Sequence, residues 1–166
     1  MFVIKPISHS SIAGALAKAE RYRLLNEPGE AESICRDILE IEPGNREALV
    51  SLLLSLTDQF SYNSGAFSAA LAVAERLESP YDRAYYAGIA WERRAKERHS
   101  GSGHSAHRYA YDWLVNALEL FEKAESHRPE GNDDCVLRWN ACVRYLDAHK
   151  ELVAAPEEIA EPIVSE

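Results

Sequence analysis

The stretch IAGALAKAERYRLLNEPGEAESICRDILEIEP, residues 12–43, contains two helix-favouring segments separated by a short break. The first segment is rich in Ala and Leu, and Ser10 or Ser11 can cap its start. The second segment carries apolar residues at helical spacing. Pro28 suits its first turn, where the missing N–H would be unpaired in any case. Because Pro43 ends the second segment, the stretch predicts a helical hairpin.

The same alternation of helical segments and short breaks continues through the rest of the chain. Strand signals are scarce, since no Asn-Gly or Asp-Gly turn stands between alternating apolar runs. Asn45 can cap a third helix, and Ser79-Pro80 can open a fifth. Five further helices are predicted at residues 46–60, 66–78, 81–98, 108–126 and 133–152. Short breaks favour antiparallel neighbours, so we expect an all-α chain of about seven helices.

Length and charge divide the chain into three parts. The 166 residues suit one domain, and the formal net charge is -9. We expect an N-terminal arm at 1–10, a helical domain at 11–150 with a loop insertion at 99–107, and an acidic tail at 151–166. The tail holds five glutamates, no Lys or Arg and two prolines. We therefore expect it to be disordered when the protein is alone.

Small and aromatic residues recur at fixed spacing inside the helices. Ala19 precedes Tyr22 by three residues, and Gly88 precedes Trp91 in the same way. In the sixth predicted helix, Phe121 follows an alanine by four residues. A small residue lets two helices approach closely, and the aromatic residue fills the space one turn away.

This pattern resembles the tetratricopeptide repeat, a helix–turn–helix unit of about 34 residues patterned W-x2-L-G-x2-Y…A-x3-F…P. The first hairpin carries its tyrosine, its second alanine and its proline as Tyr22, Ala31 and Pro43. The third predicted helix fits loosely because Leu53 stands at a small position, and the seventh has Trp139 there and is expected to be a terminal cap. The resemblance covers residues 11–150 and implies hairpins stacked as a short right-handed solenoid.

The resemblance also implies a function, because proteins of this family are usually binding scaffolds. Their first helices line a concave groove that holds a peptide or a partner helix. Carried over by position, the candidate groove residues are Glu20, Arg23, Glu47, Val50, Leu54, Thr57, Asp58, Asp82, Tyr85, Ile89, Glu92, Arg93, Asn140 and Arg144. Tyr85 and Arg93 are residue types that dominate binding hot spots. The alternative for each charged member is a solvated helix face.

Two further readings of the same resemblance concern the partner. The repeats that hold a chaperone's terminal carboxylate need Lys and Asn in the groove, whereas the matching positions here include Leu16, Glu20 and Ser51. A C-terminal acidic peptide is therefore not the expected ligand. The length and acidity also match the small acidic chaperones of type III secretion, which hold a secreted partner in extended form. A homodimer is a further possibility.

The histidines His99, His104 and His107 raise the question of a metal site. Imidazole suits zinc or nickel, and three nitrogens would leave an open position. A Gly/Ser loop is a poor frame for metal ligands, however, and several basic residues stand nearby. We expect a mobile insertion and no metal, and keep these three histidines as the alternative.

Other function classes have little support in the sequence. The chain has no G-x-S-x-G, phosphate-binding glycine loop or H-E-x-x-H, so we expect neither an enzyme nor a cofactor. The negative net charge disfavours a nucleic-acid partner. No apolar run reaches the length of a membrane span or of a signal-peptide core, so we expect a cytoplasmic protein. The three cysteines form no C-x-x-C pair and are expected to be buried thiols.

Overall fold

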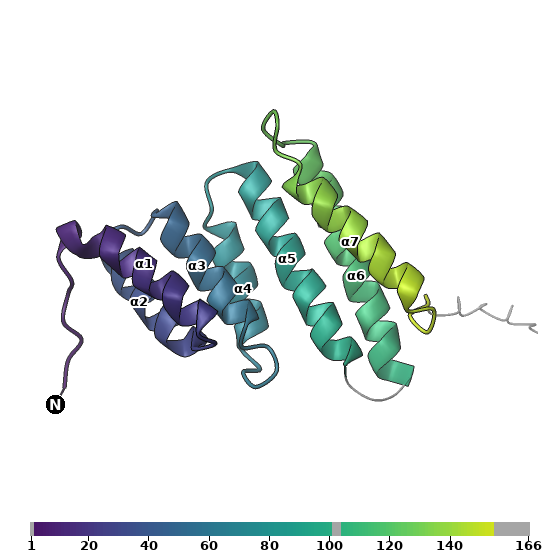
Figure 1. Cartoon of the computed structure of the whole chain (residues 1–166), viewed down its shortest axis with the longest axis horizontal. Coiled ribbons are helices and arrows are strands. Elements are labelled where there is room, and N and C mark those ends of the chain that lie inside the picture. The colour runs from purple at the N-terminus through teal and green to yellow at the C-terminus, as the bar shows by residue number, and fades with distance from the viewer. Residues whose placement is uncertain (1, 101–103, 155–166) are drawn as a thin grey trace, which may run out of the picture.

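The computed structural model describes residues 2–100 and 104–154, the side chains of residues 104 and 105 excepted. Every regular element within these ranges is helical, which confirms the all-α prediction. The helices follow one another along the long axis of the molecule (Figure 1). They are α1 (Ile12–Leu24), α2 (Pro28–Ile41), α3 (Arg46–Thr57), α4 (Ala66–Glu75), α5 (Pro80–His99), α6 (His104–Glu125) and α7 (Asp134–Ala148), with a 3₁₀ turn at His9–Ser11 before α1.

A capping side chain was predicted for the starts of three helices, and two of these starts have the expected hydrogen bond. The Asn45 side chain accepts a hydrogen bond from the Ala48 amide at 2.9 Å, and the Ser79 hydroxyl accepts one from the Asp82 amide at 3.4 Å. The third start is different. Ser11 stands at the N-cap of α1 but makes no capping bond, because its hydroxyl donates to the Ser8 carbonyl at 2.7 Å in the preceding turn.

The expected loop insertion at 99–107 is wrong. His99 is the last residue of α5, and α6 begins at His104, so His107 lies within a helix. The physical reason is an apolar stripe that begins earlier than predicted: Ala106 and Ala110 are both buried against the core at helical spacing. A second correction concerns the tail, because Leu152 is packed in the core. The rest of the predicted tail, residues 155–166, lies outside the described residues.

The core differs between the two ends of the chain. Around α1–α4 it is mostly aliphatic, with Leu49, Leu52, Leu53 and Leu56 of α3 at its centre. Around α5–α7 it is aromatic, and Trp91, Trp113 and Trp139 pack there. Phe67 of α4 joins the two, since its ring centroid lies 4.8 Å from that of Trp91.

Two helices approach closely at Gly88, where α5 meets α6. A Cβ atom placed on Gly88 would lie 2.6 Å from the Phe121 ring, so any larger residue would force this ring to move. Ala117 of α6 and Ala19 of α1 are also fully buried. The small-plus-aromatic spacing therefore does mark a close helix contact at Gly88 and Phe121.

Candidate partner-binding cleft

The helices α1, α3 and α5 are joined by ion pairs on one side of the molecule. Arg23 of α1 reaches Asp58, just after α3, at 2.9 Å. Arg93 of α5 reaches the other oxygen of the same carboxylate at 2.5 Å and also donates to the Thr57 hydroxyl at 2.8 Å. Four expected groove residues from three helices therefore meet at one point.

A second ion pair links the other end of α3 to α5. The Arg46 guanidinium donates to both oxygens of Asp82, at 2.5 and 2.8 Å. Asp82 is only 4% exposed, so its charge depends on this partner. The hydrogen bond to Asp82 raises the pKa of Arg46 above its ordinary value.

A third link connects α5 to α7. Glu92 is 1% exposed, and its carboxylate pairs with Lys96 at 2.6 Å and with Arg138 at 3.4 Å. We expected Asp82 and Glu92 in the groove, but the structure buries both between helices. The sequence places each carboxylate on a helix, but it does not reveal a counterion that lies on another helix more than 30 residues away.

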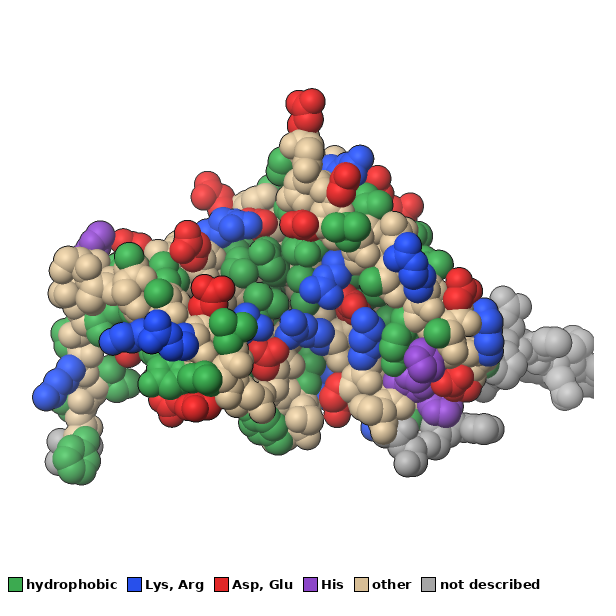
Figure 2. Space-filling view, viewed as in Figure 1, with side chains coloured by type: hydrophobic (Ala, Val, Ile, Leu, Met, Phe, Trp, Pro, Cys, Tyr) green, Lys and Arg blue, Asp and Glu red, His purple; other side chains and the backbone are tan. Residues whose placement is uncertain are grey.

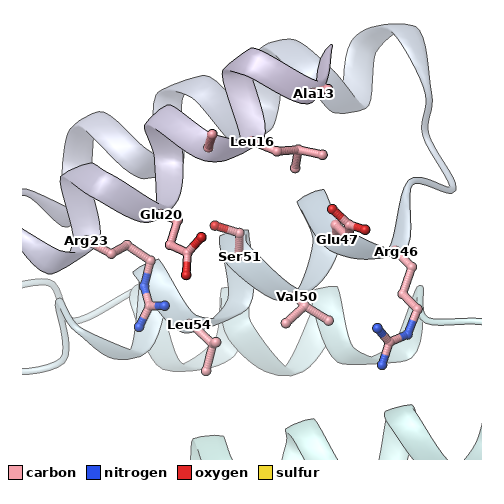
Figure 3. A pocket seen from close by; sticks show the side chains of 10 residues that line it. Ala13, Leu16, Glu20, Arg23, Arg46, Glu47, Val50, Ser51 and Leu54 are labelled. Atoms are coloured by element: carbon pink, nitrogen blue, oxygen red, sulfur yellow. The ribbon is translucent and has the colours of Figure 1, made fainter.

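Between α1 and α3 lies an open cleft of about 500 Å³ (Figure 3). Five of the expected groove residues line it: Glu20, Arg23, Glu47, Val50 and Leu54. The other lining residues are Ala13, Leu16, Ala17, Arg46 and Ser51. Leu16, Val50 and Leu54 are half-buried, so the cleft has an apolar floor.

The charged side chains around the cleft differ in whether they are paired. Arg23 and Arg46 are held by Asp58 and Asp82. Within the described part of the chain, Glu20 and Glu47 have no ion-pair partner. The Glu20 carboxylate lies toward Ser51 across the cleft (Figure 3). The unpaired charges at the cleft are therefore acidic, although charges of both signs are spread over the viewed face (Figure 2).

The remaining expected groove residues lie away from this cleft. Tyr85 is half-buried, and its ring stacks on that of Tyr81 with 5.5 Å between the ring centroids. Burial raises the pKa of Tyr85. Ile89 is buried in the same part of the core. Asn140 and Arg144 are exposed on α7. The structure thus brings together the candidates on α1 and α3 and separates them from those on α7.

The histidines predicted as an alternative metal set are also placed in part. The His99 and His107 rings lie 5.4 Å apart, whereas the side chain of His104 lies outside the described residues. The groups whose ligand atoms do lie close together are His99, His149 and Glu151. Sequence reasoning missed the last two because His149 is 50 and Glu151 is 52 residues from His99, and because Glu151 was assigned to the acidic tail.

Comparison of the chain with protein-family models, with curated proteins and with solved structures found no match. No helix among residues 2–100 and 104–154 combines the length and apolar character that crossing a bilayer requires. Function is therefore inferred from the cleft, its residues and their charges.

Proposed function

We propose that the chain is a protein-binding module of the tetratricopeptide-repeat type, in which α1/α2, α3/α4 and α5/α6 stack as a short right-handed solenoid and α7 caps it. The observation that carries this proposal is the cleft between α1 and α3, lined by five residues expected there from the family's groove positions. The ion pairs through Asp58 and Asp82 support it, because they hold the first helix of each hairpin beside the next.

The cleft favours a particular kind of partner. Its floor of Leu16, Val50 and Leu54 offers burial to an apolar side chain. Glu20 and Glu47, at its edge, attract a positively charged residue. The partner segment would therefore be a peptide or helix with an apolar anchor next to Lys or Arg.

A peptide-display selection against the purified full chain tests this proposal. We expect enrichment of sequences that combine an apolar residue with Lys or Arg. Val50→Asp places a carboxylate on the apolar floor and should abolish the enrichment. Val143→Asp is the matched control, since Val143 is exposed on α7 and does not line the cleft.

The charge part of the proposal has its own variant. Glu20→Lys together with Glu47→Lys reverses the two unpaired charges at the cleft, so selected peptides should change from basic to acidic. If no sequence is enriched, or if Val50→Asp and Val143→Asp select the same peptides as the unaltered chain, the cleft does not bind peptides.

A further inference from the structure

Two histidines and a glutamate from three separate positions meet near one end of α5. His99 is the last residue of α5, His149 is the C-cap of α7, and Glu151 follows two residues later. One Glu151 oxygen lies 2.9 Å from His99 Nε2 and 3.1 Å from His149 Nδ1. One ligand atom from each of the three groups lies within 4.8 Å of the other two.

We propose that His99, His149 and Glu151 bind a divalent zinc ion. Two imidazole nitrogens and one carboxylate oxygen form a ligand set that zinc accepts, and imidazole disfavours Mg²⁺ and Ca²⁺. At Zn–N distances of about 2.0–2.1 Å, two ligands on a tetrahedral ion lie about 3.3 Å apart. The Glu151 oxygen lies 2.9 and 3.1 Å from the two imidazole nitrogens, which is near this value, and the two nitrogens lie within 4.8 Å of each other. This site is independent of the cleft between α1 and α3.

The environment of His99 is that of a metal ligand with an outer partner. Its Nδ1 lies 2.5 Å from the Tyr145 hydroxyl oxygen, which can accept a hydrogen bond from the protonated Nδ1. This bond directs Nε2 toward Glu151 as the metal-binding nitrogen. Such a bond to the second nitrogen orients a ligating imidazole and raises its basicity. The His99 side chain is only 11% exposed, so its orientation is well fixed.

Three of the basic residues that precede His99 in α5 are paired with carboxylates. Lys96 is paired with the buried Glu92 at 2.6 Å, and Arg94 is paired with Glu97 at 3.1 Å. Arg93 points to Asp58, on the side of α3. The proposed ligands also lie at the ends of α5 and α7, and not in the Gly/Ser loop that the sequence analysis considered a poor frame for metal ligands.

Three protein ligands leave one tetrahedral position for water or a further side chain. The centroid of the His107 ring of α6 lies 5.4 Å from that of His99, so His107 is a candidate for this fourth position. A bound ion would join the segment after α7 to the end of α5. The site would therefore fasten the C-terminal end of the helical array.

Zinc titration of the tag-free, chelator-treated full chain, by calorimetry and by metal analysis after dialysis, tests the proposal. We expect one zinc per chain. His99→Ala should weaken zinc binding by about 100-fold or more, because even the loss of an outer partner typically costs about 10- to 100-fold. Tyr145→Phe, which removes only the outer partner, should weaken it by about 10-fold or more.

Two variants separate loss of the site from loss of the fold. Glu151→Gln alters a side chain that is 44% exposed, so it should reduce zinc binding without changing the helical circular dichroism spectrum. His127→Ala removes an exposed histidine beyond α6 and should leave zinc binding unchanged. No stoichiometric zinc, or zinc binding that Glu151→Gln and His99→Ala leave unaltered, would overturn the proposal and leave these groups as a hydrogen-bonded contact.

Discussion

The two ends of the molecule are built from different side chains. The helices α1–α4 are 10 to 14 residues long and pack through leucine and alanine, with an open cleft between α1 and α3. The helices α5–α7 are 15 to 22 residues long and pack through aromatic rings around Gly88 and the buried Glu92. Short aliphatic helices leave a surface that a partner can occupy. Long aromatic helices fill their own interior.

The two ends also differ in how their apolar side chains are placed. In the second half, Trp91, Trp113 and Trp139 pack against the core. The first half keeps half-buried leucine and valine side chains at the cleft, where a partner can cover them. The ion pairs at Asp58 and Asp82 link α5 of the second half to the two ends of α3.

The largest expected effect comes from the close contact of Gly88 with Phe121 in the second half. Gly88→Leu places a side chain against Phe121, where even a Cβ would lie at 2.6 Å. Such overpacking should lower the free energy of unfolding by about 2–3 kcal/mol. Thermal and urea denaturation followed by circular dichroism measure it.

The first half offers the same substitution without the contact. A Cβ on Gly14 of α1 would meet no atom within 4 Å. Gly14→Leu should therefore be neutral or stabilise by up to about 1 kcal/mol, since leucine favours helix more than glycine. Equal losses at Gly14 and Gly88 would show that the two halves are packed alike.

An intermediate effect is expected from the ion pairs. Arg138→Met removes one of two cations from Glu92, which is 1% exposed. We expect a loss of about 1–3 kcal/mol, the cost of leaving a buried polar group poorly compensated. Arg23→Met should lower the free energy of unfolding by less than about 1 kcal/mol, because Asp58 is more exposed than Glu92 and keeps Arg93 as its partner. Urea denaturation of the two variants measures the difference. A larger loss for Arg23→Met than for Arg138→Met would contradict this expectation.

The smallest effect concerns pH and the thiol of Cys142. Burial, with the nearby Glu92 charge, raises the pKa of Cys142 from 9.0 to about 12. Because the folded pKa exceeds the unfolded one, the stabilising contribution is complete below pH 9 and is lost as the pH rises toward 12. At pH 9.5 the loss should be below about 1 kcal/mol.

Cys142→Ala should flatten the fall in unfolding free energy between pH 8 and 9.5, whatever it costs at neutral pH. The same measurement on the unaltered chain provides the reference slope, to which the buried tyrosines contribute equally in both proteins. Identical slopes would mean that the Cys142 thiol titrates alike in the folded and unfolded chain.

The sequence predicts this fold best where the signal is local. Asn45 and Ser79 are found as caps because a capping side chain and its amide are three residues apart. The spacing of Gly88 and Trp91 predicts a close helix contact for the same reason. The start of α6 was missed because the Gly/Ser run hides an apolar stripe that already begins at Ala106.

Long-range partners could not be predicted in this way. Glu20, Glu47 and Val50 were expected in a groove from the resemblance to the repeat family, and the structure has them lining the cleft. Nothing in the sequence shows that Asp82 would receive Arg46 from another helix and become buried. The meeting of His99 with Glu151 likewise depends on α7 ending at Ala148, four residues before the predicted end at Leu152.

The placement of the tryptophans has a practical consequence for spectroscopy. All three, at positions 91, 113 and 139, lie in the second half of the chain. Their fluorescence therefore reports on α5–α7 and changes little when only the helices around the cleft unfold. Ellipticity reports on every helix. The unfolding curves from fluorescence and from ellipticity would coincide if the chain unfolds as a single cooperative unit. They would separate if the helices around the cleft unfold before α5–α7.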